Sequence, residues 1–161
     1  MNGCAVATST NDEFLDSISR TLAQVIRLAG SRATFAQQAG AAGVLLTQPG
    51  YALLRALIDD GPLPMSALAR ATQMDTGMVT RQVSALVNAR MVTREPDPTD
   101  GRIARAVVTN IGREVAAALQ SARRRHLQRS LYRWTLAELN EFDRLLRRFV
   151  EDTVATPIDE R

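Results

Sequence analysis

The most restrictive part of the sequence is residues 66–108, where two short helices and a β-hairpin are predicted in immediate succession. Ser66 is expected to cap the first helix, and Asp75 is expected to cap the second, which continues to about Arg90. The apolar residues of the second helix recur at helical spacing, at Val79, Val83, Leu86 and Val87. Two short helices joined by a tight turn, with the second one amphipathic, are the elements of a helix-turn-helix.

The spacing of the apolar residues then changes from helical to alternating. Residues 91–95 and 103–108 are predicted to be strands. Between them lies Pro96-Asp97-Pro98-Thr99-Asp100-Gly101, the densest turn signal in the chain. A β-hairpin with a charged tip that directly follows a helix-turn-helix has the position of a wing. The sequence therefore predicts a winged helix-turn-helix module over residues 46–109.

Further helices are predicted before this module. Asn11 or Asp12 is expected to cap a first helix, which Gly30 interrupts. The segment 31–43 is either a second, shorter helix or a loose continuation of the first. Thr47 then opens the first helix of the module. The apolar stripe of the N-terminal helix comprises Phe14, Leu15, Ile18, Leu22, Val25, Ile26 and Ala29.

Two more helices are predicted after the module. A long helix begins at Thr109 or Asn110, and a last helix begins at a capping box formed by Thr135 and Glu138. The apolar face of the last helix comprises Leu136, Leu139, Phe142, Leu145, Leu146, Phe149 and Val150. The terminal helices carry more apolar surface than so small a module covers, and the same helices of a second subunit would bury it.

The expected fold is therefore mainly α, with a single domain over residues 11–161 after a disordered segment of residues 1–10. In it the winged helix-turn-helix is flanked by dimerisation helices over residues 11–45 and 110–155. A two-fold homodimer places two recognition helices in successive major grooves. The predicted partner is double-stranded DNA with a pseudo-palindromic operator.

The residues expected to face DNA lie in the first two turns of the second helix and at the wing tip. They are Thr76, Gly77, Met78, Thr80, Arg81 and Arg102. Arg81 can pair with a guanine or a phosphate, and Arg102 can reach a narrow minor groove, although a hairpin arginine is also an ordinary solvated charge. Gly77 costs a helix up to about 1 kcal/mol relative to Ala. Its presence indicates either a close backbone approach to a partner or a loose first turn.

The residue types present argue against an enzyme, a metal-binding protein and a membrane protein. The chain has one cysteine, Cys4, and one histidine, His126, so we expect no enzyme activity, metal site or cofactor. The uncharged stretch from Ala33 to Leu54 contains Gln, Gly and Pro and is not expected to span a membrane. The first ten residues lack the apolar run of a signal peptide, so we expect a soluble, cytoplasmic protein. All 20 basic residues are arginines, whose planar fork suits phosphate and guanine.

These residues together resemble the MarR family of bacterial transcription regulators over roughly residues 12–155. The matching residues are Leu46-Thr47, Val79-Thr80-Arg81, the wing tip Asp100-Gly101-Arg102, and Thr109 with Gly112. The positions before Val79 are often Ser and Thr in that family, whereas this chain has Gly77 and Met78. That departure suggests a different operator or a looser one.

The resemblance implies a homodimer built by the terminal helices, repression of nearby genes, and release from DNA when a small effector binds, by default an aromatic one. It also implies that Asp100 supports the wing arginine. The effector-binding residues stay unassigned. Two alternatives remain open: a winged-helix protein-interaction module without DNA binding, and a redox-sensing regulator acting through Cys4, although no Arg or His lies near Cys4 in the sequence to activate its thiol.

Overall fold

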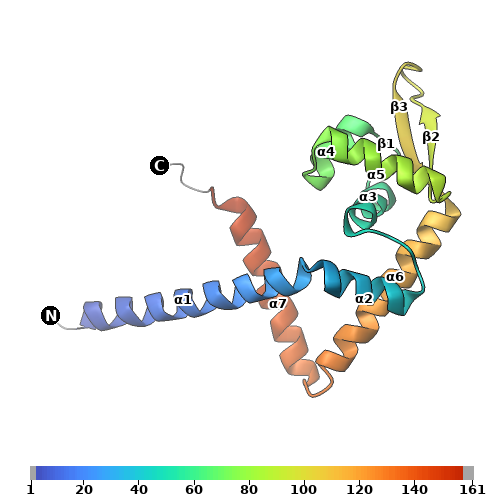
Figure 1. Ribbon diagram of the computed structural model, residues 1–161. Coiled ribbons are helices and arrows are strands. Elements are labelled where there is room, and N and C mark those ends of the chain that lie inside the picture. The colour runs from blue at the N-terminus through green and yellow to red at the C-terminus, as the bar shows by residue number, and fades with distance from the viewer. Residues whose placement is uncertain (1–2, 158–161) are drawn as a thin grey trace. The chain divides into compact units, whose positions relative to one another are not determined.

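The structure is a computed structural model that describes the backbone of residues 3–157 and the side chains of residues 11–157 (Figure 1). The chain forms two compact units, residues 1–123 and residues 124–161. In chain order the elements are α1 (Gly3–Ala29), α2 (Arg32–Ala42), α3 (Gln48–Asp59), β1 (Leu63–Pro64), α4 (Met65–Thr72), α5 (Thr76–Asn88), β2 (Val92–Pro96), β3 (Ala104–Val108), α6 (Asn110–Ser130) and α7 (Leu136–Ala155).

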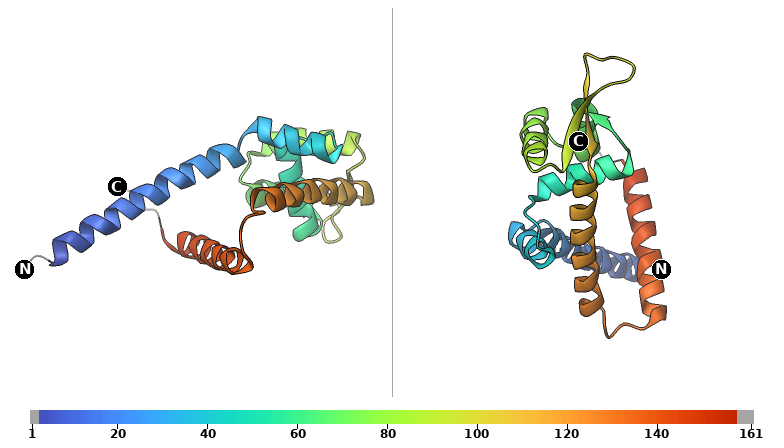
Figure 2. Two further views of the ribbon diagram at one scale, coloured as in Figure 1. Left: turned by 90° about the horizontal axis from the view of Figure 1, so that it is seen from below. Right: turned by 90° about the vertical axis from the view of Figure 1, so that its right-hand side faces the viewer.

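Helices α3, α4 and α5 and a three-stranded antiparallel sheet of order β1-β3-β2 form the winged helix-turn-helix. Strands β2 and β3 pair from Val92 opposite Val108 to Pro96 opposite Ala104. Their hairpin extends beyond the three helices in Figure 1 and in the right-hand view of Figure 2. The predicted mainly helical fold with a β-hairpin wing is confirmed.

The core of this module consists of aliphatic side chains, because the sequence has few aromatic residues to place there. Each of α3, α4, α5, β2 and β3 contributes to it. Its buried members are Leu53, Leu54, Leu57, Leu68, Val79, Val83, Leu86, Met91, Val92, Ala106 and Val108. Truncating a fully buried leucine of such a core to alanine typically costs about 2–5 kcal/mol. The positions of α5 predicted to be buried are therefore those that hold this helix against the rest of the module.

The segment whose structure the sequence left open forms a separate helix, α2. Its first turn is capped by Ser31, whose Oγ accepts from the Thr34 backbone N–H at 3.4 Å. It ends at Gly43, which has a φ of 68° and donates its N–H to the Gly40 carbonyl. Only glycine adopts this left-handed conformation without steric cost, so the chain can turn sharply into the connector of residues 44–47.

Arg123 of α6 holds α2 and α3 together. Its guanidinium lies 4.5 Å from the ring centroid of Tyr51 and 5.6 Å from that of Phe35. Its Nε donates to Gln38 Oε1 at 2.8 Å. Phe35 and Tyr51 are buried with Ala39, Ala116 and Leu119 in a second, smaller cluster. The connector between α2 and α3 is therefore bounded on both sides by packed helices.

Two expectations about helix starts were wrong. Helix α4 begins at Met65 after Pro64, so Ser66 lies inside the helix and does not cap it. The reason is that Leu63 pairs with Ala106, which keeps the chain extended up to Pro64, whose fixed φ then suits the start of a helix. Helix α1 begins at Gly3, so residues 3–10, expected to be disordered, are helical, and Asn11 and Asp12 lie inside the helix instead of capping it. No proline or glycine interrupts the sequence from there to Ala29, and residues 1–2 lie outside the described part.

The second unit contains the end of α6 and the helix α7. The predicted capping box is present: Thr135 Oγ1 accepts from the Glu138 N–H at 3.3 Å, and the Glu138 carboxylate accepts from the Thr135 N–H at 2.7 Å. Trp134 packs edge-on against Phe142, with ring centroids 5.3 Å apart. One face of α7 carries the ion pairs Arg144–Glu141, Arg147–Asp143 and Arg148–Asp152. The opposite face exposes Phe142, Leu145, Leu146, Phe149 and Val150.

Gly112 in the first turn of α6 lies directly against the backbone at the base of the wing. A Cβ added there would overlap the Met91 carbonyl oxygen and would lie 2.9 Å from Val108 Cγ2. The resemblance to the family marked this glycine, and the structure supplies the physical reason for it. Gly40 of α2 is a matched contrast, since a Cβ there meets nothing within 4 Å.

We expect Gly112→Ala to lower the free energy of unfolding by about 1–3 kcal/mol or more, because the obstructing atoms belong to the backbone and cannot rotate away. Gly40→Ala should instead raise it by up to about 1 kcal/mol, since Ala favours a helix over Gly. Urea unfolding of the two variants beside the parent measures both changes. Equal stability of the Gly112→Ala variant and the parent would contradict the close approach.

Candidate nucleic-acid interface

The first two turns of α5 present most of the predicted DNA-facing residues to solvent. Asp75 caps the helix by accepting from the Met78 N–H at 2.8 Å. Val79 is buried, and the side chains exposed around it are Thr76, Gly77, Thr80 and Arg81. Met78 differs from these, because it is half-buried and lines a cavity. The geometry thus leaves the two threonines, Gly77 and Arg81 available for a partner, whereas Met78 faces partly into the protein.

The wing tip is a hydrogen-bonded turn that carries Arg102. Asp100 Oδ1 accepts from the Arg102 backbone N–H at 3.0 Å, and the Asp100 carbonyl accepts from the Ile103 N–H at 2.9 Å. Asp100 therefore supports the backbone at Arg102, while the guanidinium itself is exposed. An exposed arginine on an ordered hairpin tip can enter a minor groove without first reorganising the turn.

A second carboxylate, Asp97, braces the wing from inside, and the sequence reasoning missed it. Asp97 Oδ1 accepts from the Thr99 N–H at 2.8 Å and from the Thr99 hydroxyl, and Asp97 Oδ2 lies 3.5 Å from Arg105 Nε across the hairpin. The Thr99 hydroxyl, then the Thr99 and Asp100 N–H groups and the charge of Arg105, lower the pKa of Asp97. The Asp-Pro-Thr spacing is typical of a side-chain turn and could have indicated this role.

Arg94 joins the wing to the recognition helix, and no local signal marked it. It lies on β2 and donates from Nη2 to Ser84 Oγ of α5 at 2.9 Å. Ser84 in turn donates to the Thr80 carbonyl at 2.8 Å. This pairing joins residues ten apart in the chain and depends on how the hairpin folds back beside α5. It was therefore invisible to sequence spacing alone.

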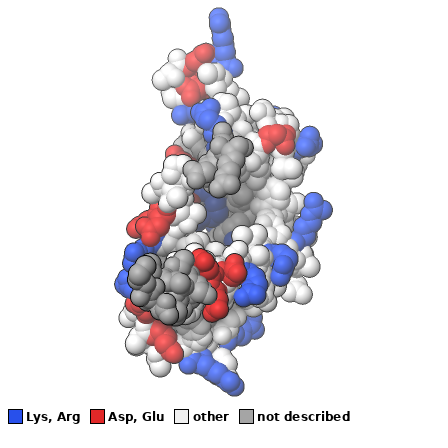
Figure 3. Space-filling model, turned by 90° about the vertical axis from the view of Figure 1, so that its left-hand side faces the viewer, with Lys and Arg blue, Asp and Glu red and all other residues white. Residues whose placement is uncertain are grey.

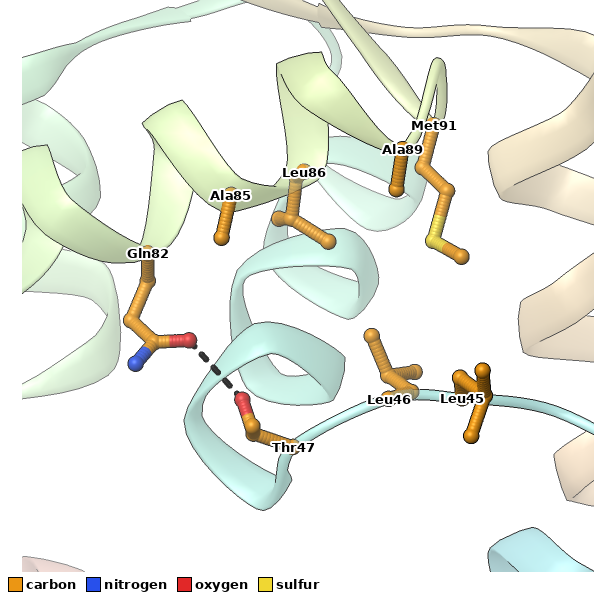
Figure 4. A pocket seen from close by; sticks show the side chains of 8 residues that line it. All are labelled: Leu45, Leu46, Thr47, Gln82, Ala85, Leu86, Ala89 and Met91. Carbon is orange, nitrogen blue, oxygen red and sulfur yellow. Dashed lines mark hydrogen bonds between the residues drawn. The ribbon is translucent and has the colours of Figure 1, made fainter.

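Thr47 fixes the start of α3 to the recognition helix. Its hydroxyl accepts from the Gly50 N–H at 3.1 Å and donates to Gln82 Oε1 of α5 at 2.8 Å (Figure 4). Beside this bond lies an apolar cavity of about 330 Å³ between the connector and the C-terminal half of α5. Figure 4 shows its lining residues, Leu45, Leu46, Thr47, Gln82, Ala85, Leu86, Ala89 and Met91.

Another cavity, of about 410 Å³, lies between α2, the start of α3 and the recognition helix. It is lined by Arg32, Ala36, Leu46, Thr47, Gln48, Pro49, Met78 and Gln82. Its walls are largely apolar and carry one guanidinium, which is the composition of a site for a small molecule. Because Met78 and Gln82 belong to α5, any occupant would touch the recognition helix directly.

The described residues show neither a large patch of one charge on the drawn face nor a metal-binding cluster. Arginines and acidic residues are interspersed with uncharged residues on the face that Figure 3 draws.

Among the described residues, no group of three or more His, Cys, Asp or Glu side chains is placed to hold a metal ion. His126 is exposed, and the Cys4 side chain lies outside the described part of the chain. Across residues 3–157, no helix combines the length and apolar character needed to cross a membrane.

Comparison with known proteins agrees with this geometry. Residues 46–104 match the model of the MarR family. YxaD of Bacillus subtilis, an uncharacterized HTH-type transcriptional regulator, is 32% identical over 103 residues, which are 64% of this chain and 72% of that protein. The crystal structure of RV1404 from Mycobacterium tuberculosis is 28% identical and has a TM-score of 0.71, covering 91% of this chain and 97% of its own. A MarR family protein from Bacillus stearothermophilus, 20% identical, shares the fold with a TM-score of 0.68, covering 96% and 99%.

The fold and the similar proteins define a DNA-binding transcription regulator of the winged helix-turn-helix class. The match spans the helix-turn-helix and most of the wing, where the predicted contact residues lie. The chain belongs to the MarR family.

The hydrogen bonds of Asp97 in the wing predict how this part of the hairpin responds to pH. The folded-state pKa of Asp97 lies below the ordinary value of 3.8, so the carboxylate stabilises the wing above that pH and the contribution is lost as the pH falls through the lowered pKa. We therefore expect the NMR shift of the Thr99 amide, which donates to Asp97, to titrate with a midpoint below 3.8. In Asp97→Asn this titration should disappear, whereas Asp59→Asn, a substitution on α3, should leave it intact. A midpoint at or above 3.8 would contradict the brace.

Proposed function

We propose that the protein acts in the cytoplasm as a homodimeric, sequence-specific repressor that leaves its operator when a small molecule binds. The observation that carries the DNA-binding part is the pair Arg81 and Arg102. Both are exposed, one on the recognition helix and one on the wing, and neither forms an ion pair within residues 11–157. Arginines kept free in these two places suit a guanine edge or phosphate in the major groove and the negative potential of a minor groove.

The homodimer is supported by the exposed apolar faces of the terminal helices. On α1 Phe14, Leu15, Ile18, Val25 and Ile26 are exposed, and α7 exposes its own apolar face. Burying one such side chain contributes about 1.5–3 kcal/mol, so leaving both faces in water is costly. A second copy would cover them and present two recognition helices about 34–36 Å apart, which suits a pseudo-palindromic operator. In this proposal residues 46–109 bind DNA, and residues 11–45 and 110–155 form the dimer.

Release by a small molecule is supported by the cavity that Met78 and Gln82 line. Its volume of about 410 Å³ is in the range that small ligands occupy. Arg32 offers a charged donor, and the apolar wall suits a small aromatic effector. An occupant would press on α5 and on the Thr47–Gln82 bond, so binding of effector and DNA would be linked through the position of the recognition helix.

The function is tested by retaining sheared genomic DNA on the purified protein at two salt concentrations and sequencing the fragments. We expect a few pseudo-palindromic sites whose retention falls as salt rises. The same selection is repeated with small aromatic acids added, and lower retention of the recovered sites would show that the acids release the protein from DNA. Retention that ignores sequence, or none at all, would favour a module that binds proteins instead. Loss of retention on mild oxidation, absent in Cys4→Ser, would favour the redox alternative.

On the recovered operator, Arg81→Ala should cost about 1–3 kcal/mol and relax the base preference, because a base contact carries sequence information. Arg102→Ala should weaken binding to all sequences and reduce the slope of log K against log salt by about 1, as expected for a phosphate or groove contact. Fluorescence anisotropy with operator and scrambled duplexes measures both effects. Arg55→Ala on α3, which removes an ion pair with Asp59, is the control. Parent-like binding by both variants would refute the docking of α5 and the wing.

The dimer predicts a difference between the two faces of α7. Phe149→Asp places a charge on the apolar face and should shift the protein toward monomer, because the carboxylate would have to be buried in the interface. Asn140→Asp adds the same charge elsewhere on this helix and should leave association unchanged. Sedimentation equilibrium of the two variants measures the shift. A monomeric parent protein, or equal association of both variants, would argue against this interface.

A further inference from the structure

Gly77 lies beneath the side chain of Arg81, the candidate base-reading residue. The two residues are four apart on α5, so they occupy the same face one turn from each other. Side chains on a helix lean toward its N-terminus, which directs Arg81 back over the first turn. A Cβ built on Gly77 would lie 3.5 Å from Arg81 Nη1. That distance is an ordinary contact, so a methyl group fits beside the guanidinium, whereas the further atoms of a longer side chain such as leucine would compete with it for the same surface.

The other side of this space is closed by the helix cap. The same Cβ would lie 3.1 Å from Asp75 Oδ1, which accepts the Met78 N–H at 2.8 Å. The carboxylate cannot move away without weakening the cap. A side chain at position 77 is thus confined between a fixed oxygen and the guanidinium. The cap oxygen is the tighter of the two neighbours, and the flexible end of Arg81 is the one that can move when a longer side chain stands at position 77.

We propose that Gly77 is a specificity-determining residue that acts through Arg81, by leaving free the surface on which the guanidinium lies when it is presented to a base. The inference rests on the proposed function, in which Arg81 faces the DNA. In this role Gly77 neither contacts DNA directly nor merely loosens the first turn of α5, because it acts through the position of Arg81.

A double-mutant cycle separates this role from a close approach of the DNA backbone to Gly77. The proteins are full-length Gly77→Leu, Arg81→Ala and the double variant, with affinities measured on the operator and on duplexes changed at the base pair that Arg81 selects. With Arg81 present, Gly77→Leu should reduce discrimination at that base pair about tenfold or more, which is the scale of a lost bidentate contact. In the Arg81→Ala background the same substitution should change affinity less than about twofold, the size of error in such cycles.

Equal losses in both backgrounds would overturn the inference, because they would mean that the side chain meets DNA directly. Unchanged discrimination by Gly77→Leu would overturn it as well. If Arg81→Ala keeps the parent's base preference, the proposed role of Arg81 is wrong, and the role of Gly77 is wrong with it. If Arg81→Ala loses that preference and Gly77→Leu does not, only the role of Gly77 is wrong. Gly77→Ala, whose Cβ would lie at an ordinary contact distance from Arg81 Nη1, should keep a discrimination close to that of the parent. Gly40→Leu, at a helical glycine with open space, is the matched control and should keep the parent's discrimination. Retained binding of the Gly77 variants to unrelated duplexes would show that they are folded.

Discussion

The close approach of the first turn of α6 to the backbone at Met91 is the contact on which the DNA-binding module depends. The Thr109 N–H donates to the Met91 carbonyl at 3.0 Å, and the Thr109 hydroxyl donates to the Arg90 carbonyl at 2.8 Å. Gly112 lies against the same carbonyl with no room for a side chain. Arg90 adopts a left-handed φ of 59°, which costs a non-glycine residue about 1–2 kcal/mol, and these contacts offset that cost. Because the hairpin leaves α5 and returns to α6 at this point, its base is fixed.

From this base, single polar contacts determine how the recognition surface is presented. Arg94 connects the hairpin to Ser84 of α5, and Gln82 connects the other side of α5 to Thr47. The recognition helix is thus held by the wing on one side and by the start of α3 on the other. Such fixed geometry lowers the entropy lost on binding, because fewer side chains and loops must be ordered. A molecule bound beside Thr47 and Gln82 would therefore contact the recognition helix itself.

Local signals in the sequence predicted most of this fold, and long-range pairing accounts for what they missed. Asp75 and Thr135 cap helices as expected because their hydrogen bonds close within one turn. Ser66 failed as a cap because Pro64 is held extended by β3, some forty residues away. At the interface, exposure around Val79 follows from helical spacing, so Thr76, Thr80 and Arg81 could be selected from the sequence. The Asp97–Arg105 and Arg94–Ser84 pairs could not, since each needs the register of the hairpin or its position against α5.

The distribution of apolar residues is the physical basis of the proposed homodimer. The winged module buries its own aliphatic residues. Five of them are fully buried: Leu53, Leu54, Leu68, Val79 and Val83. Helices α1 and α7 keep theirs in water, with Phe14 64% exposed and Phe149 40% exposed. A face that the module does not need for its own stability is available for association. In the proposed homodimer, association would double the number of arginines that read DNA, and the discrimination of about 1–3 kcal/mol per base contact would add over two half-sites. The apolar terminal helices and the exposed arginines of α5 and the wing would thus serve the same function, because the dimer would bring two sets of these arginines to one DNA site.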